Sequence, residues 1–187
     1  MDAPFPKEVV SRLSEILAFV FFFVLLRCTD FSVQDIGIKS VNFRRELKET
    51  FLIGLLLFGT LTGLKCLLLQ LGVGPFHHSA PFFDWSRPGT FYIEYIFIAV
   101  LQEFLANCVL QENLNRVLTV KNGKLWALVI ASFMFMALHL HLRLIYMLGA
   151  GVLKFVLGIL YNRHRSILGL SFLHYEFGII AKILQWT

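Results

Sequence analysis

The stretch FLIGLLLFGTLTGLKCLLLQL, residues 51–71, decides the fold class of this chain. Its apolar run is interrupted only by polar Thr and Gln and by one lysine, Lys65. An α-helix of about 20 residues is about 30 Å long, which matches the hydrocarbon core of a bilayer. The stretch therefore predicts a helix that crosses a membrane.

The composition of the whole chain also indicates a membrane environment. Of its 187 residues, 57% are hydrophobic, only 16% are charged and 20 are Phe, with a mean hydropathy of +0.72. Such values are typical of a polytopic membrane protein. We therefore expect an all-α, polytopic membrane helix bundle with about six transmembrane helices, surrounded by a lipid bilayer.

The chain contains five further apolar stretches, which makes six in total. They are Ile16–Leu26, Phe91–Leu110, Leu125–Leu142, Ile145–Tyr161 and Ile167–Leu184. The first is short, so we expect residues 9–15 to precede it as an amphipathic lead-in. Residues 72–90 contain Gly-Pro and Pro-Gly pairs and are predicted to form the one long loop. Within it, His77 and His78 are interpreted as solvated residues rather than metal ligands.

The basic residues predict an orientation. The formal net charge is +5, but Lys and Arg are spread over the loops, so we expect no nucleic-acid partner. With six spans, ten basic residues fall on one side and about five on the other, which places the richer side in the cytoplasm. The ten are Arg27, Lys39, Arg44, Arg45, Lys48, Arg116, Lys121, Lys124, Arg163 and Arg165. We expect an integral, multi-pass protein of a bacterial plasma membrane, with cytoplasmic basic loops.

The cysteines do not indicate a site. Cys28, Cys66 and Cys108 have no CxxC spacing and lie in or beside apolar runs. They therefore frame neither a disulfide scaffold nor a zinc site, and we expect them to pack in the core.

Polar residues in the third predicted span indicate a functional site. Ionisable groups inside a bilayer are costly, and they usually face the interior of the bundle. Glu103, Asn107 and Gln111 are four residues apart and share one helix face, with Gln102 about 100° to the side. This span thus offers a carboxylate and several amides to the centre of the bundle.

Two other spans carry histidines. His139 and His141 are two residues apart, as are His174 and Glu176, so the members of each pair differ by about 200° around the helix. A carboxylate and two histidines from three helices can hold and deprotonate a water molecule. The alternative is that these groups only hydrogen-bond across helices. Two lysines within the spans, Lys65 and Lys154, would neutralise such carboxylates or snorkel to the interface.

These residues resemble the motifs of a known family. VLQEFLANCVLQ, residues 100–111, resembles the Glu-Glu-x-x-x-Arg helix of the CPBP family, the Abi-like group of CAAX prenyl endopeptidases and bacteriocin-processing intramembrane proteases. SFMFMALH, residues 132–139, resembles the Phe-x-x-x-His motif, and residues 155–174 are similar to the run into the His-x-x-x-Asn motif. DIGIK, residues 35–39, is similar to the family's approach to its core. The resemblance implies a CPBP-like core over residues 35–187, after a lead-in and first transmembrane helix over residues 1–34.

The resemblance also implies site residues. Four positions match residue for residue: Glu103, His139 and His174, which are implied to be catalytic, and Phe135, which is implied to support them. Three positions are degenerate. Gln102 stands where the family has the glutamate implied to activate water, and Asn107 stands where it has an arginine. Gly178 stands where the family has the asparagine implied to stabilise the oxyanion.

Two functions stay open at this point. The chain is interpreted first as an incomplete intramembrane endopeptidase that acts by binding or regulating a membrane protein or membrane-anchored peptide. The alternative is an active CAAX-type endopeptidase in which Glu103, His139 and His174 hydrolyse such a peptide, with Glu103 or, less favourably placed, Glu176 as the base. A proton-coupled transporter is a weaker third class, because no repeated half appears in the hydropathy. No cofactor is assigned. A divalent metal such as zinc stays open, because the H-x-H and H-x-E spacings are too common and too badly phased to assert a metal site.

Overall fold

The computed structural model describes residues 7–28, 37, 42–73, 76, 80–86, 89, 91–140 and 144–186. Across these residues the secondary structure is helical and contains no strand, which confirms the expected all-α class. Helix α1 spans Lys7–Cys28 and α2 spans Phe43–Leu71. A third, continuous helix consists of α3 (Phe91–Glu103), the π-helix η1 (Phe104–Gln111) and α4 (Glu112–Val117). Helices α5 (Gly123–Leu138), α6 (Leu144–His164) and α7 (Leu168–Ile183) follow.

Three of these helices are long and apolar enough to cross a bilayer. They cover Phe43–Leu71, Tyr92–Val117 and Leu144–His164, and α5 is a shorter apolar helix. Each of the six apolar stretches in the sequence lies mainly in one of the six continuous helices. The chain is therefore a helical bundle of an integral membrane protein.

Two of the predicted boundaries were wrong for local reasons. The fourth stretch was expected to run to Leu142, but α5 ends at Leu138 because the His139 N–H bonds the Met136 carbonyl three residues back, at 3.0 Å. Helix α2 begins eight residues earlier than its apolar stretch, since the Asn42 side chain accepts a hydrogen bond from the Arg45 N–H at 3.1 Å and caps it.

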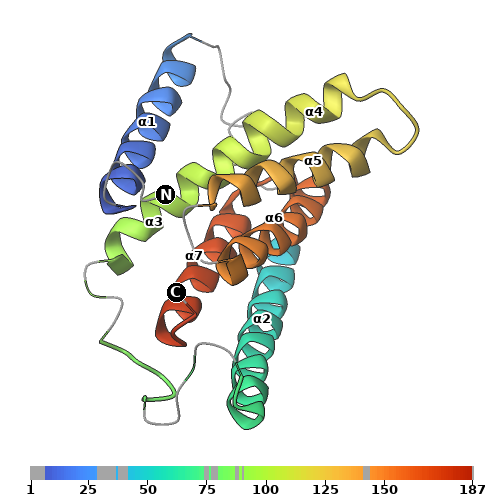
Figure 1. Ribbon diagram of the computed structural model, residues 1–187. Coiled ribbons are helices and arrows are strands. Elements are labelled where there is room, and N and C mark those ends of the chain that lie inside the picture. The colour runs from blue at the N-terminus through green and yellow to red at the C-terminus, as the bar shows by residue number, and fades with distance from the viewer. Residues whose placement is uncertain are drawn as a thin grey trace.

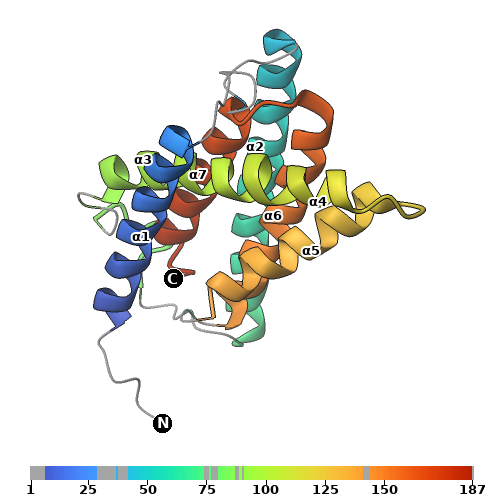
Figure 2. The ribbon, with the colours of Figure 1, turned by 90° about the horizontal axis from the view of Figure 1, so that it is seen from above.

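The helices form a compact group with one outlying member (Figure 1). The α3–η1–α4 helix and α5 lie side by side, and α5 packs on α6. Helix α7 packs between α2 and α3. Helix α1 lies at the edge of the bundle in both ribbon views (Figure 2) and contacts η1 through Phe22 and Phe104, whose ring centroids are 4.9 Å apart. The centre of the bundle is thus built by η1, α5, α6 and α7.

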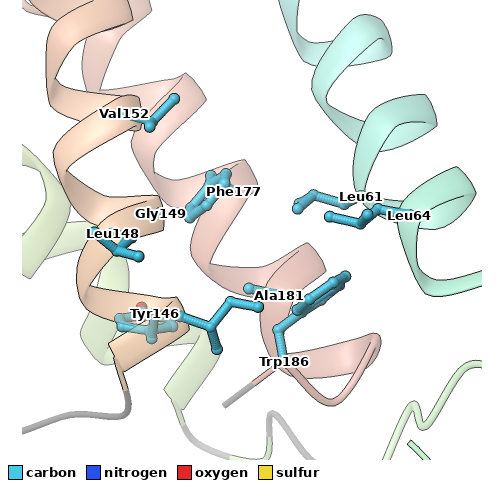
Figure 3. Close-up of a pocket in the computed structure, with 10 residues that line it drawn as sticks. Leu61, Leu64, Tyr146, Leu148, Gly149, Val152, Phe177, Ala181 and Trp186 are labelled. Atoms are coloured by element: carbon cyan, nitrogen blue, oxygen red, sulfur yellow. The ribbon is translucent and has the colours of Figure 1, made fainter. Parts of the chain in front are cut away.

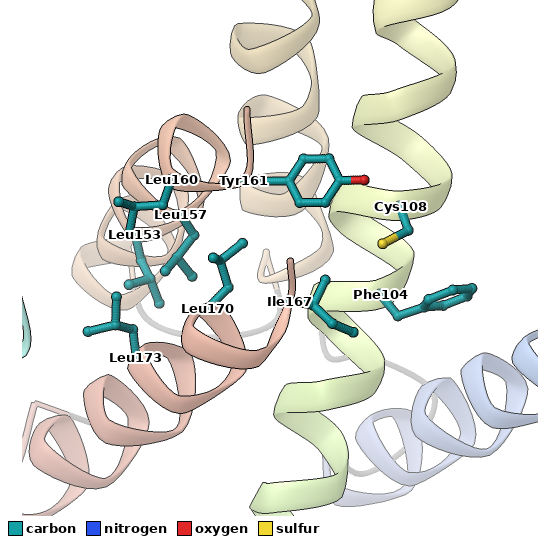
Figure 4. Packing of buried hydrophobic residues seen from close by; sticks show 9 residues of the cluster. All are labelled: Phe104, Cys108, Leu153, Leu157, Leu160, Tyr161, Ile167, Leu170 and Leu173. Atoms are coloured by element: carbon teal, nitrogen blue, oxygen red, sulfur yellow. The ribbon is translucent and has the colours of Figure 1, made fainter. Parts of the chain in front are cut away.

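The largest hydrophobic cluster joins η1, α6 and α7 (Figure 4). Its buried residues are Phe104, Cys108, Leu153, Leu157, Leu160, Tyr161, Ile167, Leu170 and Leu173. Core packing is therefore confirmed for Cys108, but it was wrong for Cys28 and Cys66, which are exposed on the outer faces of their helices. Apolar periodicity cannot tell a core face from a face that meets lipid.

Ion pairs gather where α2 begins and α6 ends. Glu49 accepts from Arg45 at 2.9 Å and pairs with Arg163 at 3.1 Å. Glu112 of α4 pairs with Arg165 at 2.5 Å. These contacts tie the ends of α2, α4 and α6 together with three of the basic residues counted on the lysine- and arginine-rich side.

Candidate functional site

A buried carboxylate, Glu103, lies at the centre of the site. It is the last residue of α3 and is fully buried. Its Oε1 is 2.6 Å from Nδ1 of His174 on α7, and its Oε2 accepts a hydrogen bond from Asn107 Nδ2 at 2.6 Å. Because a carboxylate only accepts, the imidazole donates its Nδ1–H to Glu103. Both oxygens of Glu103 are therefore held by protein groups.

A π-helix carries the amides of the site. In η1 the N–H of Glu112 reaches the carbonyl of Asn107, five residues back, instead of four. The wider turns place Asn107 and Gln111 in the interior, where both are fully buried. Short π-helical segments are frequent at functional sites. Nothing in the sequence distinguishes this segment from an ordinary α-helix.

Lys154 of α6 completes a chain of buried polar side chains. Its Nζ donates to Asn107 Oδ1 at 2.7 Å and to Gln111 Oε1 at 2.8 Å, and the residue is fully buried. Gln111 Nε2 in turn donates to the Gly158 carbonyl at 3.0 Å. Lys154 therefore does not snorkel to the interface, which was one of the two alternatives for it. It meets Glu103 through an amide rather than directly.

Phe135 lies between the two histidines of the site. Its ring centroid is 4.7 Å from that of His139 and 5.8 Å from that of His174. His139 follows the end of α5, is half-buried, and its Nδ1 lies 2.8 Å from the Phe135 carbonyl. The fold thus brings together the four residues that match the family motif, Glu103, Phe135, His139 and His174.

Tyr95 fills the space beside Gly178 that a side chain there would occupy. An ideal Cβ built on Gly178 would lie 2.1 Å from Tyr95 Cε1 and 2.6 Å from its hydroxyl oxygen. The Tyr95 ring also meets the His174 ring edge-on, at 5.8 Å, and its hydroxyl is hydrogen-bonded to Tyr146. Tyr95 was not predicted as a site residue, and it precedes Glu103 by eight residues, a little over two helical turns.

The remaining candidates lie apart from this chain of contacts. Gln102 is half-buried, and its buried Oε1 has no hydrogen-bond partner among the described residues. The Glu176 carboxylate turns toward α2, since a Cβ on Gly54 would lie 2.4 Å from its Oε2. Lys65 Nζ donates to the Phe82 carbonyl at 2.7 Å. His77, His78 and His141 lie outside the described residues.

An apolar pocket of about 230 Å³ opens between α2, α6 and α7 (Figure 3). Leu61 and Leu64 line it from α2, Tyr146 and Val152 from α6, and Phe177 from α7. Tyr146 links this pocket to the site, because it is also the partner of Tyr95. Within the described residues, no group of three or more His, Cys, Asp and Glu side chains is arranged to hold a metal ion.

Comparison with known proteins identifies a matching family model. Residues 84–179, just over half of the chain, match the family model described as Rce1-like, type II CAAX prenyl endopeptidase Rce1-like. No curated protein and no solved structure matches the chain significantly. The matched residues include the α3–η1–α4 helix, α5, α6 and most of α7, and therefore every side chain of the site.

Proposed function

The chain belongs to the Rce1-like family of type II CAAX prenyl endopeptidases, and from that premise we propose that it uses its intramembrane site to bind a membrane-anchored peptide or membrane protein, with little or no cleavage. The observation that carries the proposal is the engagement of Glu103, both of whose oxygens accept hydrogen bonds from the protein. Glu103 is therefore engaged by the protein rather than free to take a proton from water.

The chemistry of hydrolysis explains why this matters. A peptidase of this kind needs a group that takes a proton from the attacking water. Gln102 occupies the position of the family's first glutamate, and an amide does not accept that proton. Glu103 would have to give up either His174 or Asn107 to replace it. Each exchange leaves a buried polar group without a partner, at a cost of about 1–3 kcal/mol.

The proposed ligand is a segment anchored in the bilayer by an apolar group. The substrates named in the family's description are prenylated CAAX proteins, which end in a lipid-modified cysteine and three further residues. The apolar pocket between α2, α6 and α7 suits the apolar part of such a ligand. Tyr146 connects that pocket to His174 through Tyr95. We further propose that the end of the bundle that carries Arg45, Arg163 and Arg165 faces the cytoplasm.

The test uses a farnesylated CAAX-type peptide as the probe, with the protein in lipid nanodiscs. Binding is measured by fluorescence anisotropy of a labelled peptide and cleavage by mass spectrometry. We expect saturable binding without release of the three C-terminal residues. Phe135→Ala, which opens the site, should weaken binding, whereas Phe133→Ala on the exposed face of the same helix should not. Absence of saturable binding would refute the proposal.

One restoring substitution sharpens the test. Gln102→Glu returns the missing carboxylate in a side chain of the same shape and size, and it breaks no hydrogen bond of Oε1, which has no partner among the described residues. If the scaffold is intact, this variant should gain measurable cleavage of the same peptide. Restoring asparagine at position 178 is a poorer choice, since Tyr95 already fills that space.

One contact favours the alternative of an active endopeptidase. The 2.6 Å contact between Glu103 and His174 is the arrangement in which a carboxylate orients an imidazole and leaves Nε2 to act as a base. In that case wild-type protein would cleave the farnesylated peptide, and both Glu103→Gln and His174→Ala would abolish cleavage. Cleavage that survives both substitutions would come from a contaminating protease.

A further inference from the structure

We propose that the end of the bundle where α2 begins and α6 ends carries a binding site for the phosphate group of an anionic phospholipid, formed by Arg45 and Arg163. The proposal goes beyond the proposed function, because it concerns a lipid on the outer surface and not the buried site around Glu103. It starts from two guanidinium groups that converge on a single carboxylate oxygen.

Both arginines meet at Glu49. Arg45 Nε donates to Glu49 Oε1 at 2.9 Å, and Arg163 Nη2 lies 3.1 Å from the same oxygen. His164 Nε2 approaches the other oxygen, Oε2, at 2.9 Å. The arginines come from different membrane-spanning helices, so only the tertiary structure places their guanidinium groups side by side.

The charges in this cluster do not balance. Two guanidinium groups share one carboxylate, which leaves an excess of positive charge even when His164 is neutral. Each guanidinium carries several N–H donors, and the contacts with Glu49 use one nitrogen of each. The side chains of Arg45 and Arg163 are 57% and 50% exposed, so their other donors can reach a ligand. A phosphodiester monoanion would neutralise the excess charge and can accept two parallel hydrogen bonds from an arginine.

The depth of the pair in the bilayer suits a lipid headgroup. Helix α2 has 29 residues, whereas its apolar stretch covers only residues 51–71. At about 1.5 Å per residue, that stretch alone is about 32 Å long and fills a hydrocarbon core of about 30 Å. The first turns of α2, with Arg45 and Glu49, therefore extend into the headgroup layer. Arg163 is the last residue but one of α6, and its contact with Glu49 places it at the same level.

Exposed apolar side chains continue from Arg45 toward the hydrocarbon core. Leu52 and Leu56 follow it by about two and three helical turns and share its face of α2. Both leucines are more than half exposed. A phospholipid has the same order of parts, an anionic group followed by acyl chains. This order favours a phospholipid over a soluble phosphate compound as the occupant.

A second pair of basic residues at this end of the bundle provides a matched control. Lys121 and Lys124 are exposed and lie at the turn between α4 and α5. This turn projects away from the beginning of α2 in both ribbon views (Figures 1 and 2). A general attraction of anionic lipids to basic residues would involve both pairs. A site at Glu49 would involve only the arginines.

The test measures lipid binding to the whole protein in detergent by native mass spectrometry. The probe is dioleoylphosphatidylglycerol, and zwitterionic dioleoylphosphatidylcholine is its counterpart. We expect tighter binding of phosphatidylglycerol, and a loss of about 30-fold in its affinity when Arg45→Gln and Arg163→Gln are combined, because two cations beside the anionic lipid are lost. Lys121→Gln combined with Lys124→Gln removes the same charge and should leave the affinity nearly unchanged, since salt screens distant charges.

Equal losses in the two double variants, or a wild type without preference for phosphatidylglycerol, would overturn the proposal. Arg45→Lys combined with Arg163→Lys keeps the charge and decides the question if the glutamine variant does not fold. Its ammonium groups lack the planar fork of arginine, so binding should still weaken, and unchanged binding would refute the site. Displacement of the lipid by inorganic phosphate at constant ionic strength would also refute it, because the site would then take a soluble anion.

Discussion

The surroundings of Lys154 and of Lys65 show two ways in which this fold buries a lysine. Around Lys154 the partners are side-chain amides that continue to a carboxylate and an imidazole on other helices. Around Lys65 the partners are a backbone carbonyl and aromatic rings in the segment that follows α2. The first region joins several helices through side-chain hydrogen bonds, whereas the second holds a loop segment close to α2. Burial alone therefore does not mark a lysine as part of a site.

The largest effect should come from removing the carboxylate that balances Lys154. Glu103→Leu leaves Asn107 Nδ2 buried without its acceptor and the Lys154 ammonium buried without a counter-charge, so we expect a loss of about 3–5 kcal/mol in the free energy of unfolding. Unfolding is measured by circular dichroism during an SDS titration in mixed micelles. Glu103→Leu combined with Lys154→Met should recover most of the loss. A single variant as stable as the wild type would remove the distinction between the two regions.

A smaller effect is expected on the opposite side of His174. Gly178→Asn forces a side chain into the Tyr95 ring, and we expect a loss of about 3 kcal/mol from overpacking. Adding Tyr95→Ala to the Gly178→Asn variant should recover the lost stability. Stability is again measured by the SDS titration. If the double variant is no more stable than Gly178→Asn, the space beside Gly178 is limited by something other than Tyr95.

The room left for Lys154 can be tested with a pair of glycines. Gly158→Ala brings a Cβ to 2.3 Å from Leu128 Cδ1 and should cost about 1–3 kcal/mol. Gly59→Ala in α2 meets nothing within 4 Å, so alanine's better helix propensity should leave stability equal or raise it by up to about 1 kcal/mol. Thermal unfolding in detergent compares the two. Equal losses would contradict the tight packing described around Lys154.

The smallest effect should follow from Lys65→Met. The substitution removes one charged hydrogen bond to a carbonyl but also ends the burial of a charge, so we expect a net loss of about 1–2 kcal/mol. Limited proteolysis should show faster cleavage within residues 80–86, which Lys65 fastens through Phe82. A loss as large as that of Glu103→Leu would mean that Lys65 supports more than this loop.

Much of the fold could be predicted because the bilayer sets strict rules for the chain. Backbone polar groups in a bilayer must be paired within a helix, so six apolar stretches were enough to place the six continuous helices of the described residues, three of which are long enough to cross. The ends were less predictable. Helix α5 ends before His139 through a local turn, and α2 begins at Phe43 because Asn42 caps it. The predicted burial was wrong for two of the three cysteines, because an apolar helix face can meet either lipid or the protein core.

The candidate site was only partly predictable. The four-residue spacing placed Glu103, Asn107 and Gln111 on one face, and the contact of Asn107 with Glu103 agrees with it. Spacing did not indicate that Lys154, 47 residues later than Asn107, would reach that face. It also left Tyr95 unnoticed, because an aromatic residue in an apolar span is usually a packing residue.

The sequence by itself determined that this is a membrane-embedded helical protein whose residues resemble the motifs of its family. These conclusions depend on composition, on helical periodicity and on local spacing, which are properties of neighbouring residues along the chain. Only the tertiary structure decided which side chains lie beside two of the polar and small positions: Lys154 lies beside Asn107, and Tyr95 lies beside Gly178. The physical reason is that a buried charge and a filled space are satisfied by whichever side chain packs nearest, and in a bundle that side chain can belong to another helix.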